Sequence, residues 1–394
     1  MQSMSGTQSS NSRNLVFTRL FLDFFKSEKF SGFLLIGCTA LSLLVANSSW
    51  GENYANFWHY PFAGLTVELW INDGLMAIFF LLVGLEIERE IYIGELSTFR
   101  LAILPIVAAL GGMLVPAGIH LLLNNGTPTA SGAGIPMATD IAFALGILSL
   151  AGKAVPPAIK VFLTALAIID DLGAILVIAL FYTEQLSILY LSIALLTFAL
   201  LFFMGKKGIT KGWVYGIGGL VLWYCMFRSG VHATISGVLL AFAIPFGKGG
   251  DQSLSARLQH FLHPIVAYFI VPVFALANTG IILSGEILHT LGSVNSLGIM
   301  MGLTLGKPIG IVLFSAVAVQ IKTASLPSGV AWKHIMAAGM LAGIGFTMSI
   351  FITILAFPDS ATIVSSKVAI LVASLLSAFI GLFTFRLFGS RSIQ

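Results

Sequence analysis

The chain has 394 residues, of which 57% are hydrophobic and only 9% are Asp, Glu, Lys or Arg, with a net charge of +4 at pH 7. Soluble globular domains carry about 25% charged residues, so this composition excludes a soluble enzyme, a nucleic-acid-binding protein and a disordered chain. It predicts an all-α polytopic membrane protein, because about twelve spans of about 20 residues fit within this length. Both cysteines, Cys38 and Cys225, lie in apolar runs, so no disulfide framework is predicted.

Residues 1–30 are predicted to be a cytoplasmic N-terminal segment. They lack the early apolar core and the small-residue cleavage site of a secretory signal. Within them, residues 14–26 place Arg19, Asp23 and Lys26 on one helical face and Leu and Phe on the other. This pattern is typical of a short helix that lies on the membrane surface.

Residues 31–389 are the predicted transmembrane domain, and residues 390–394 are a short cytoplasmic tail. Within the domain, twelve apolar runs recur that are long enough to cross a bilayer as helices. We number them spans 1 to 12 in chain order. They cover residues 31–47, 69–85, 101–123, 134–150, 158–182, 186–204, 212–228, 231–246, 264–284, 296–321, 332–357 and 366–385.

Basic residues predict the orientation of these spans, because cytoplasmic loops carry an excess of Lys and Arg. Most of the 20 basic residues lie before span 1, in the loops after even-numbered spans or after span 12. Arg228 and Lys367 are exceptions on the far side, and Lys307 lies inside span 10. Both termini are therefore predicted to be cytoplasmic, which requires an even number of spans.

Residues 48–68, between spans 1 and 2, form a predicted external segment without any basic residue. Its aromatic side chains suit the boundary between membrane and water, so the segment is either an ordinary interfacial belt or a hairpin. These aromatic residues are Trp50, Tyr54, Phe57, Trp58 and Tyr60.

Four charged residues lie in the middle of predicted spans, where each costs about 2.5–3.5 kcal/mol on insertion. They are Asp140 in span 4, Asp170 and Asp171 in span 5, and Lys307 in span 10. Neighbouring residues on a helix point about 100° apart, so one member of the aspartate pair can face a water-filled cavity while the other faces a helix or a counter-ion. Three Asp and one Lys do not cancel as simple pairs, which favours a functional site over a structural salt bridge.

The chemistry of these carboxylates predicts ion exchange. Carboxylate oxygens are hard ligands that suit small cations. A carboxylate in a partly dry site can instead hold a proton when no cation is bound. A single such site makes sodium ions and protons compete, and it needs no cofactor.

Spans 4 and 11 are predicted to be discontinuous, because glycine weakens a helix and Thr or Ser can satisfy the freed backbone groups. Glycine alone would fit close helix packing equally well. However, span 4 is the middle of spans 3–5, span 11 is the middle of spans 10–12, and the two triplets run in opposite directions. The sequence therefore predicts inverted-topology repeats, with Asp140 and Lys307 available to balance the exposed helix dipoles. The interruptions contain Gly132, Gly134, Pro136, Thr139 and Asp140 in span 4, and Gly343, Gly345, Thr347 and Ser349 in span 11.

Seven stretches carry a more specific pattern. They are WINDGLMAIFFLLVGLEIERE (70–90), ATDIAFALGIL (138–148), LAIIDDLGAILVIALFYT (166–183), SGVHAT (229–234), HPIVAYFIVPVFALAN (263–278), GKPIGI (306–311) and GIGFTMSIF (343–351). From span 2 to span 11, the chain resembles the NhaA-type bacterial sodium/proton antiporters. That family is itself a known example of transporters built from inverted repeats.

The resemblance implies a secondary active antiporter of the bacterial cytoplasmic (inner) membrane. It would export Na⁺ or Li⁺ in exchange for H⁺, electrogenically and under pH regulation, with no cofactor. Asp170 and Asp171 stand at the family's cation- and proton-exchanging pair, and Thr139 joins them as an expected ligand of the transported Na⁺. Thr139 and Asp140 fall at the first helix break, and Lys307 stands at the lysine that compensates dipoles and partners the first aspartate.

The resemblance also implies a cytoplasmic pH-sensing cluster at the end of span 2 and before span 9. Gln259 departs from the family pattern, which has an acid there, and Glu88 stands where the family has a base. His232 is either a packed histidine at a helix end or a further sensor. A homodimer through the external segment 48–68 is implied as well. The residues that match the cluster are Glu86, Arg89, Glu90, His260 and His263.

Other membrane functions fit the sequence less well. A sodium-coupled symporter for an organic anion would need basic residues in the spans, and Lys307 is the candidate there. An intramembrane aspartyl protease would carry G-x-G-D, and a rhomboid-type protease G-x-S-G, and the sequence has neither. It also has no nucleotide-binding or metal-cluster motif, so the expected partners are the transported ions and the lipid bilayer.

Overall fold

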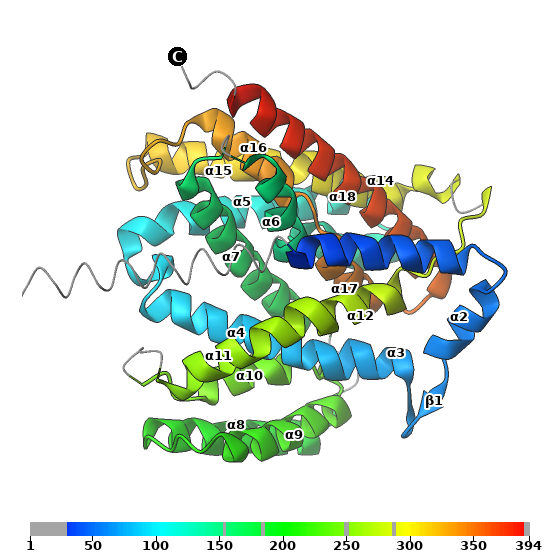
Figure 1. Cartoon of the computed structure of the whole chain (residues 1–394), viewed down its shortest axis with the longest axis vertical. Coiled ribbons are helices and arrows are strands. Elements are labelled where there is room, and N and C mark those ends of the chain that lie inside the picture. Colours follow the sequence, from blue (N-terminus) through cyan, green and yellow to red (C-terminus); the bar gives the residue numbers. More distant parts are fainter. Residues whose placement is uncertain (1–29, 153–154, 183–185, 248–251, 286–288, 390–394) are drawn as a thin grey trace, which may run out of the picture.

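The computed structural model describes residues 30–389, with gaps at 153–154, 183–185, 248–251 and 286–288. The predicted surface helix at 14–26 and the predicted tail at 390–394 lie outside the described residues. Within the described part, the chain is largely helical (Figure 1). Its β structure there is one antiparallel hairpin in the segment 48–68, formed by β1 (Pro61–Phe62) and β2 (Leu65–Thr66).

The helices follow one another along the chain with short connections. The first is Phe30–Ala46. The following α-helices are α2 (Gly51–Trp58), α3 (Val67–Leu69), α4 (Met76–Tyr92), α5 (Phe99–Asn124), α6 (Ile141–Leu150), α7 (Pro157–Phe181), α8 (Ile188–Lys206), α9 (Gly212–Ser229), α10 (Ile235–Ala243), α11 (Leu254–Ile265), α12 (Val271–Asn278), α14 (Val294–Met301), α15 (Lys307–Gln320), α16 (Trp332–Ala342), α17 (Phe346–Ala356) and α18 (Ser360–Gly389). The π-helical turns are η1 (Trp70–Leu75), η5 (Val266–Ile270) and η7 (Gly302–Gly306), and the 3₁₀ segments are η2 (Glu95–Ser97), η3 (Pro128–Met137) and η6 (Thr290–Gly292).

Seven continuous helices in the described residues are long and apolar enough to cross a membrane. Three further pairs of helices are long and apolar enough to cross a membrane when each pair is taken as one bent span. The described part therefore provides up to ten spans. The predicted total of twelve is not reached by this measure. Helices α9 and α10 occupy predicted spans 7 and 8 but are not among the ten, and α10 has only 9 residues.

The boundaries predicted for span 9 are wrong. Helix α11, the turn η5 and helix α12 form one continuous helix, Leu254–Asn278, which begins ten residues before the predicted start at 264. Arg257 and two histidines lower the hydropathy of α11, so its sequence does not resemble a membrane span. His260 and His263 therefore lie within this helix, not before it.

The two interrupted spans are bent by the same angle, 47°, between η3 and α6 and between α16 and α17. The two breaks contact each other, because the Asp140 backbone N–H donates to the Ile344 carbonyl at 2.7 Å. A Cβ atom at Gly343 would lie 2.3 Å from the Leu303 carbonyl oxygen, so only glycine lets this break approach the turn η7. The broken helices thus meet in the interior.

The helices pack in two groups. The core group contains η3, α5, α6, α7 and α14–α18 with η7, and the scaffold group contains η1, α4 and α8–α12 with η5; each packs mainly within itself. In Figure 1, the core group lies mostly in the upper part and the scaffold group in the lower part. Between the groups, α4 contacts α7 and α12 contacts α17. Within the core group, a Cβ atom at Gly111 would lie 2.2 Å from the Gly310 carbonyl oxygen, so α5 and α15 meet backbone to backbone.

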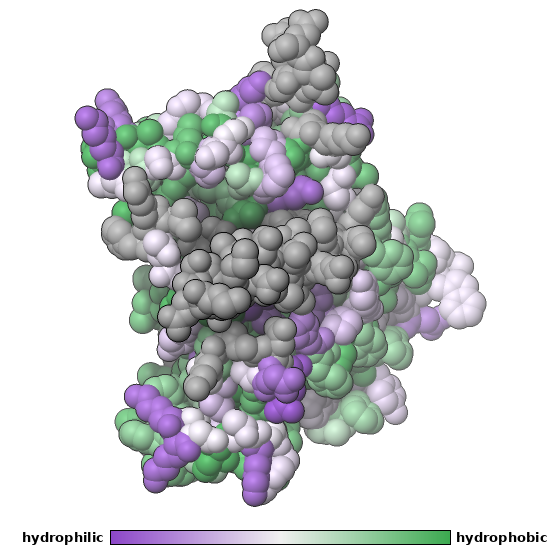
Figure 2. Space-filling view, turned by 60° about the vertical axis from the view of Figure 1, so that its left-hand side comes forward, coloured by the Kyte–Doolittle hydropathy of each residue, from purple (hydrophilic) through white to green (hydrophobic). Residues whose placement is uncertain are grey.

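The surface of the described residues is largely apolar, as expected for a protein surrounded by lipid. In Figure 2, hydrophilic residues form a few separate clusters between broader hydrophobic areas. Large apolar side chains remain exposed along the helices because lipid tails, not water, cover them. Examples are Leu122, Leu180, Phe181, Ile188, Leu220 and Phe379.

Candidate functional site

Asp170, on α7, forms an ion pair with Lys307, the first residue of α15. The Lys307 Nζ atom lies 2.5 Å from Asp170 Oδ2, and both side chains are fully buried. Such a pair is retained in an apolar interior only when the opposite charges and further hydrogen bonds compensate the lost hydration. In this conformation, the negative charge of Asp170 is therefore already compensated.

Thr139 links this ion pair to the helix breaks. It lies between η3 and α6, and its Oγ1 atom accepts a hydrogen bond from Lys307. The same hydroxyl lies 2.7 Å from Asp170 Oδ2 and 2.9 Å from the carbonyl oxygen of Ala342, the last residue of α16. A hydroxyl has one hydrogen, so it donates to one of these acceptors at a time. A small change in its rotation therefore alters how strongly Asp170 is held.

Asp140 accepts hydrogen bonds at the N-termini of two helices. Its Oδ1 atom accepts from the Phe143 backbone N–H of α6 at 2.9 Å, which makes it the N-cap of that helix. Its Oδ2 atom accepts from the backbone N–H of Thr347 on α17 at 3.1 Å and from the Thr347 hydroxyl. Helix N-termini carry partial positive charge, so one carboxylate balances both.

Asp171 has different surroundings from Asp170, although the two are neighbours on α7. Its side chain is buried, and its Oδ1 atom has no hydrogen-bond partner. It lines a cavity of about 70 Å³, which is large enough for a few water molecules. A buried carboxylate oxygen without a partner is costly, so this oxygen is a natural acceptor for a cation, a proton or water.

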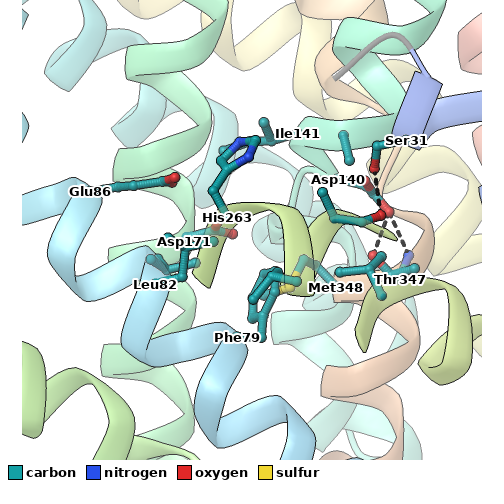
Figure 3. A pocket seen from close by; sticks show the side chains of 15 residues that line it. Ser31, Phe79, Leu82, Glu86, Asp140, Ile141, Asp171, His263, Thr347 and Met348 are labelled. Carbon is teal, nitrogen blue, oxygen red and sulfur yellow. Dashed lines mark hydrogen bonds between the residues drawn. The ribbon is translucent and has the colours of Figure 1, made fainter. Parts of the chain in front are cut away.

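The cavity lies between the two packing groups. Asp140, Asp171 and Thr347 line it from the core group, and Glu86 on α4 and His263 on α11 line it from the scaffold group. Figure 3 shows Glu86, His263 and Asp171 toward one side of the cavity and Asp140 with Thr347 toward the other. Two residues that the resemblance assigned to pH sensing thus lie at the same cavity as the unpartnered Asp171.

The other residues assigned to pH sensing do not line this cavity. Arg89 and Glu90 are paired at the long N–O distance of 4.0 Å. His260 is exposed, one turn before His263 on α11. His232 lies elsewhere, with its Nε2 atom 2.7 Å from the Tyr182 carbonyl oxygen, close to the ends of α7 and α9.

Comparison with known proteins assigns the chain to a family. Residues 22–385 match the family model described as Na⁺/H⁺ antiporter 1. The chain belongs to this Na⁺/H⁺ antiporter family.

Full-length relatives support the same assignment. The Na⁺/H⁺ antiporter NhaA of Flavobacterium psychrophilum is 58% identical over 369 residues, which cover 94% of this chain and 96% of the relative. The Na⁺/H⁺ antiporter NhaA of Cytophaga hutchinsonii is 56% identical over 365 residues, 93% of this chain and 94% of the relative. The Na⁺/H⁺ antiporter NhaA of Vibrio cholerae serotype O1 is 50% identical over 369 residues, which cover 93% of this chain and 97% of the relative. The resemblance predicted from the seven motifs is confirmed, and the protein is a multi-pass membrane transporter rather than an enzyme.

In the described residues, this member of the Na⁺/H⁺ antiporter family has no preformed metal-binding cluster. The described residues contain no group of three or more His, Cys, Asp or Glu side chains that could hold a metal ion. Asp140 and Asp171 line the same cavity, whereas Asp170 is paired with Lys307. Thr139 contacts Asp170 and Lys307, whereas no hydrogen bond joins it to Asp171.

Several features near the site were not predicted from the sequence. The sequence predicts Thr347 in the second break but not its hydrogen bonds to Asp140, and it gives no signal that Ser31 and Met348 line the cavity. The π-helical turn η5 begins three residues after His263, and η7 ends immediately before Lys307; neither turn was predicted. Prolines beside them were a usable signal, because proline lacks the N–H of the α-helical pattern. These prolines are Pro264, Pro272 and Pro308.

Proposed function

We propose that the protein exports Na⁺, or Li⁺, in exchange for H⁺ across a bacterial cytoplasmic membrane, with both termini in the cytoplasm. Three relatives named as Na⁺/H⁺ antiporters support this proposal at 50–58% identity over nearly the whole chain. The excess of Lys and Arg in the predicted cytoplasmic loops supports the orientation.

The observation that carries the proposal is the hydrogen bonding of the aspartate pair. The Oδ1 atoms of both Asp170 and Asp171 are buried without a partner. Two neighbouring carboxylates with free oxygens form a site to which a small hard cation would bind. Asp171 lines the cavity, so we assign it as the primary cation ligand, with Asp170 and Thr139 completing the site after Lys307 moves away.

Exchange then follows from competition at this site. When Na⁺ leaves on the outer side, protons bind the freed carboxylates, and they are released after the site returns to the cytoplasmic side. Asp171 and either Asp170 or Lys307 would each carry one proton per Na⁺. The cycle would thus move one net positive charge inward, and the membrane potential would contribute about 2.3 kcal/mol per 100 mV to sodium export.

The proposed architecture has twelve spans, with α9 and α10 as spans 7 and 8, and inverted repeats that place both helix breaks at the site. We assign pH regulation to Glu86 and His263, which line the cytoplasmic cavity, together with Arg89, Glu90 and His260 nearby. We also propose that the segment 48–68, with its exposed aromatic residues and hairpin, joins two copies of the chain as a homodimer.

The direct test measures sodium-driven pH change in everted membrane vesicles that contain this chain. Addition of Na⁺ should release protons from the acidified vesicle interior, and vesicles containing the Asp171→Asn variant should not respond. Absence of a response in the wild type, with the protein folded and in the membrane, would refute antiport. In liposomes without a pH gradient, an inside-negative potential should accelerate sodium efflux, whereas exchange that ignores voltage would refute the proposed stoichiometry.

A further inference from the structure

A second buried polar cluster lies far from the cavity, at the other end of the scaffold group. It contains Lys367 on α18, Asn278 at the end of α12 and Asn72 in η1. Asn278 follows His263 by 15 residues on the continuous helix Leu254–Asn278, which corresponds to roughly 20 Å along the axis. The cluster therefore lies toward the membrane side that carries β1 and β2, on the right of Figure 1.

Hydrogen bonds connect these three side chains in series. Asn278 donates from Nδ2 to Asn72 Oδ1 at 2.8 Å and to the Phe274 carbonyl at 3.0 Å. The Lys367 Nζ atom lies 3.5 Å from Asn278 Oδ1, and the residue is only 8% exposed. An ammonium group has three donors, and this contact is long. Lys367 is thus a buried cation held by a weak bond.

The cluster joins the two packing groups. Lys367 belongs to α18 of the core group, whereas Asn278 and Asn72 belong to the scaffold group. At the opposite end, the same two groups are separated by the cavity of about 70 Å³. A small cavity therefore lies between the groups at one end, and the Lys367 contact joins them at the other.

The backbone at Asn72 gives an independent reason to consider this cluster functional. Three π-helical turns occur in the described residues. Two of them adjoin the exchange site, since η7 precedes Lys307 and η5 contributes Val266 and Ala267 to the cavity. The third, η1, contains Asn72. Such turns are rare and are frequently found at functional sites.

We propose that Lys367, Asn278 and Asn72 form an outer latch that closes the external side of the ion path while the cavity is open to the cytoplasm. The inference rests on the proposed antiport and its orientation. Transporters with a central site expose it alternately by moving one helix group against the other, so the outer contact must break in each cycle. A weak contact suits this requirement.

The charge of Lys367 gives the latch a second effect. A buried ammonium in the closed path is an electrostatic barrier to Na⁺, as positive side chains are in other pores. When the groups separate, we expect Lys367 to move with α18 away from Asn278 and Asn72, so that the barrier leaves the path as it opens.

Accessibility of a buried reporter tests the latch. Thr279 directly follows Asn278 and is fully buried, so a cysteine at this position becomes accessible only when the outer side opens. The reporter protein carries Thr279→Cys, and Cys38→Ser and Cys225→Ser remove the two natural cysteines. A membrane-impermeant thiol reagent added outside should react slowly with this protein. With Lys367→Met, the rate should rise several-fold, because the weak contact with Asn278 is lost.

Two controls accompany this measurement. Lys367→Arg keeps the charge and should react slowly. Lys207→Met removes an exposed lysine outside the latch and should also leave the rate unchanged. Equal reaction rates for Lys367→Met and the parent protein would overturn the latch.

A variant that strengthens the latch guards against effects of misfolding. Asn278→Asp places a carboxylate against Lys367 with the same shape, and Asn72 can rotate its amide to donate to it. We expect slower labelling at position 279 and several-fold slower exchange, both restored when Lys367→Met is added. Faster labelling in Asn278→Asp would contradict the proposal.

The labelling readout does not require antiport. If the labelling rate rises with Lys367→Met but the protein shows no sodium-driven proton movement, the proposed function is refuted and the closed outer contact is still supported. Normal antiport with labelling that ignores Lys367 would refute the latch alone.

Discussion

Asp170 and Asp171 are adjacent on α7, but only Asp170 is paired with a cation. Lys307 lies 2.5 Å from Asp170, whereas the Oδ1 atom of Asp171 is buried without a partner beside the cavity. The helical rotation of about 100° between neighbours separates the two side chains in this way. Substitutions at the two positions should therefore have different consequences.

Asp171→Asn should abolish sodium-dependent proton movement and leave the protein as stable as the wild type, because it removes an unpaired carboxylate. Asp170→Asn should instead lower the free energy of unfolding by about 3–5 kcal/mol, since it leaves Lys307 buried without its counter-charge. Thermal unfolding in detergent and exchange in vesicles check the two expectations. Equal loss of stability in both variants would contradict the assignment.

Lys307→Arg should retain more stability and exchange than Lys307→Ala. Arginine keeps the positive charge opposite Asp170, whereas alanine leaves a buried carboxylate and the Thr139 hydroxyl without their donor. The expected difference is of the order of 3 kcal/mol in unfolding free energy. Identical melting curves for the two variants would show that the positive charge of Lys307 does not stabilise the protein. If exchange survives in Lys307→Ala without its voltage dependence, Lys307 is the second proton carrier.

Asp140→Asn should be tolerated better than Asp140→Ala. The amide oxygen of Asn can still cap α6, whereas Ala removes the acceptor for the backbone N–H groups of both Phe143 and Thr347. Loss of one helix cap lowers the free energy of unfolding by about 0.5–2 kcal/mol. The Asp140→Ala variant loses the cap at two helices, so its free energy of unfolding should fall by up to twice that amount. Thr347→Val, which removes the hydroxyl but keeps the backbone donor, is the matched comparison and should lie between them. A fully stable Asp140→Ala protein would contradict the role of this carboxylate at the two helix ends.

His263→Gln should move the onset of exchange to lower pH, with maximal activity largely retained. A protonated His263 would repel a cation from the cavity that it shares with Asp171. Glutamine stays neutral, so this inhibition at low pH should disappear. His260→Gln should change the pH profile less, because His260 is exposed and does not line the cavity. Complete inactivity of His263→Gln at every pH would instead make His263 part of the ion path.

The most informative part of the sequence is the set of charged residues inside predicted membrane spans. Asp140, Asp170, Asp171 and Lys307 stood out because nothing in a lipid-facing helix explains them, and all four are buried in the structure. The motifs around them also identified the family, which the comparisons confirm.

Other features could not be predicted because they depend on tertiary packing. A residue pair on one helix does not reveal which member meets a lysine from another helix, so the residue pattern alone left the partner of Lys307 open. Helix α11 is polar enough to resemble a loop, and only its packing against α4 explains why it continues into α12.

The missing hydrogen bond of Asp171 also bears on leakage. Carrying a bare carboxylate through the low-dielectric middle of the protein is costly, whereas a carboxylate neutralised by Na⁺ or H⁺ is not. Asp170 avoids this cost through Lys307, but Asp171 has no such protection. We therefore expect that the empty carrier seldom changes sides, so that sodium outside the cell cannot return without a proton moving the other way. The tight coupling of the two ion gradients would thus depend on one oxygen atom that the fold leaves unsatisfied.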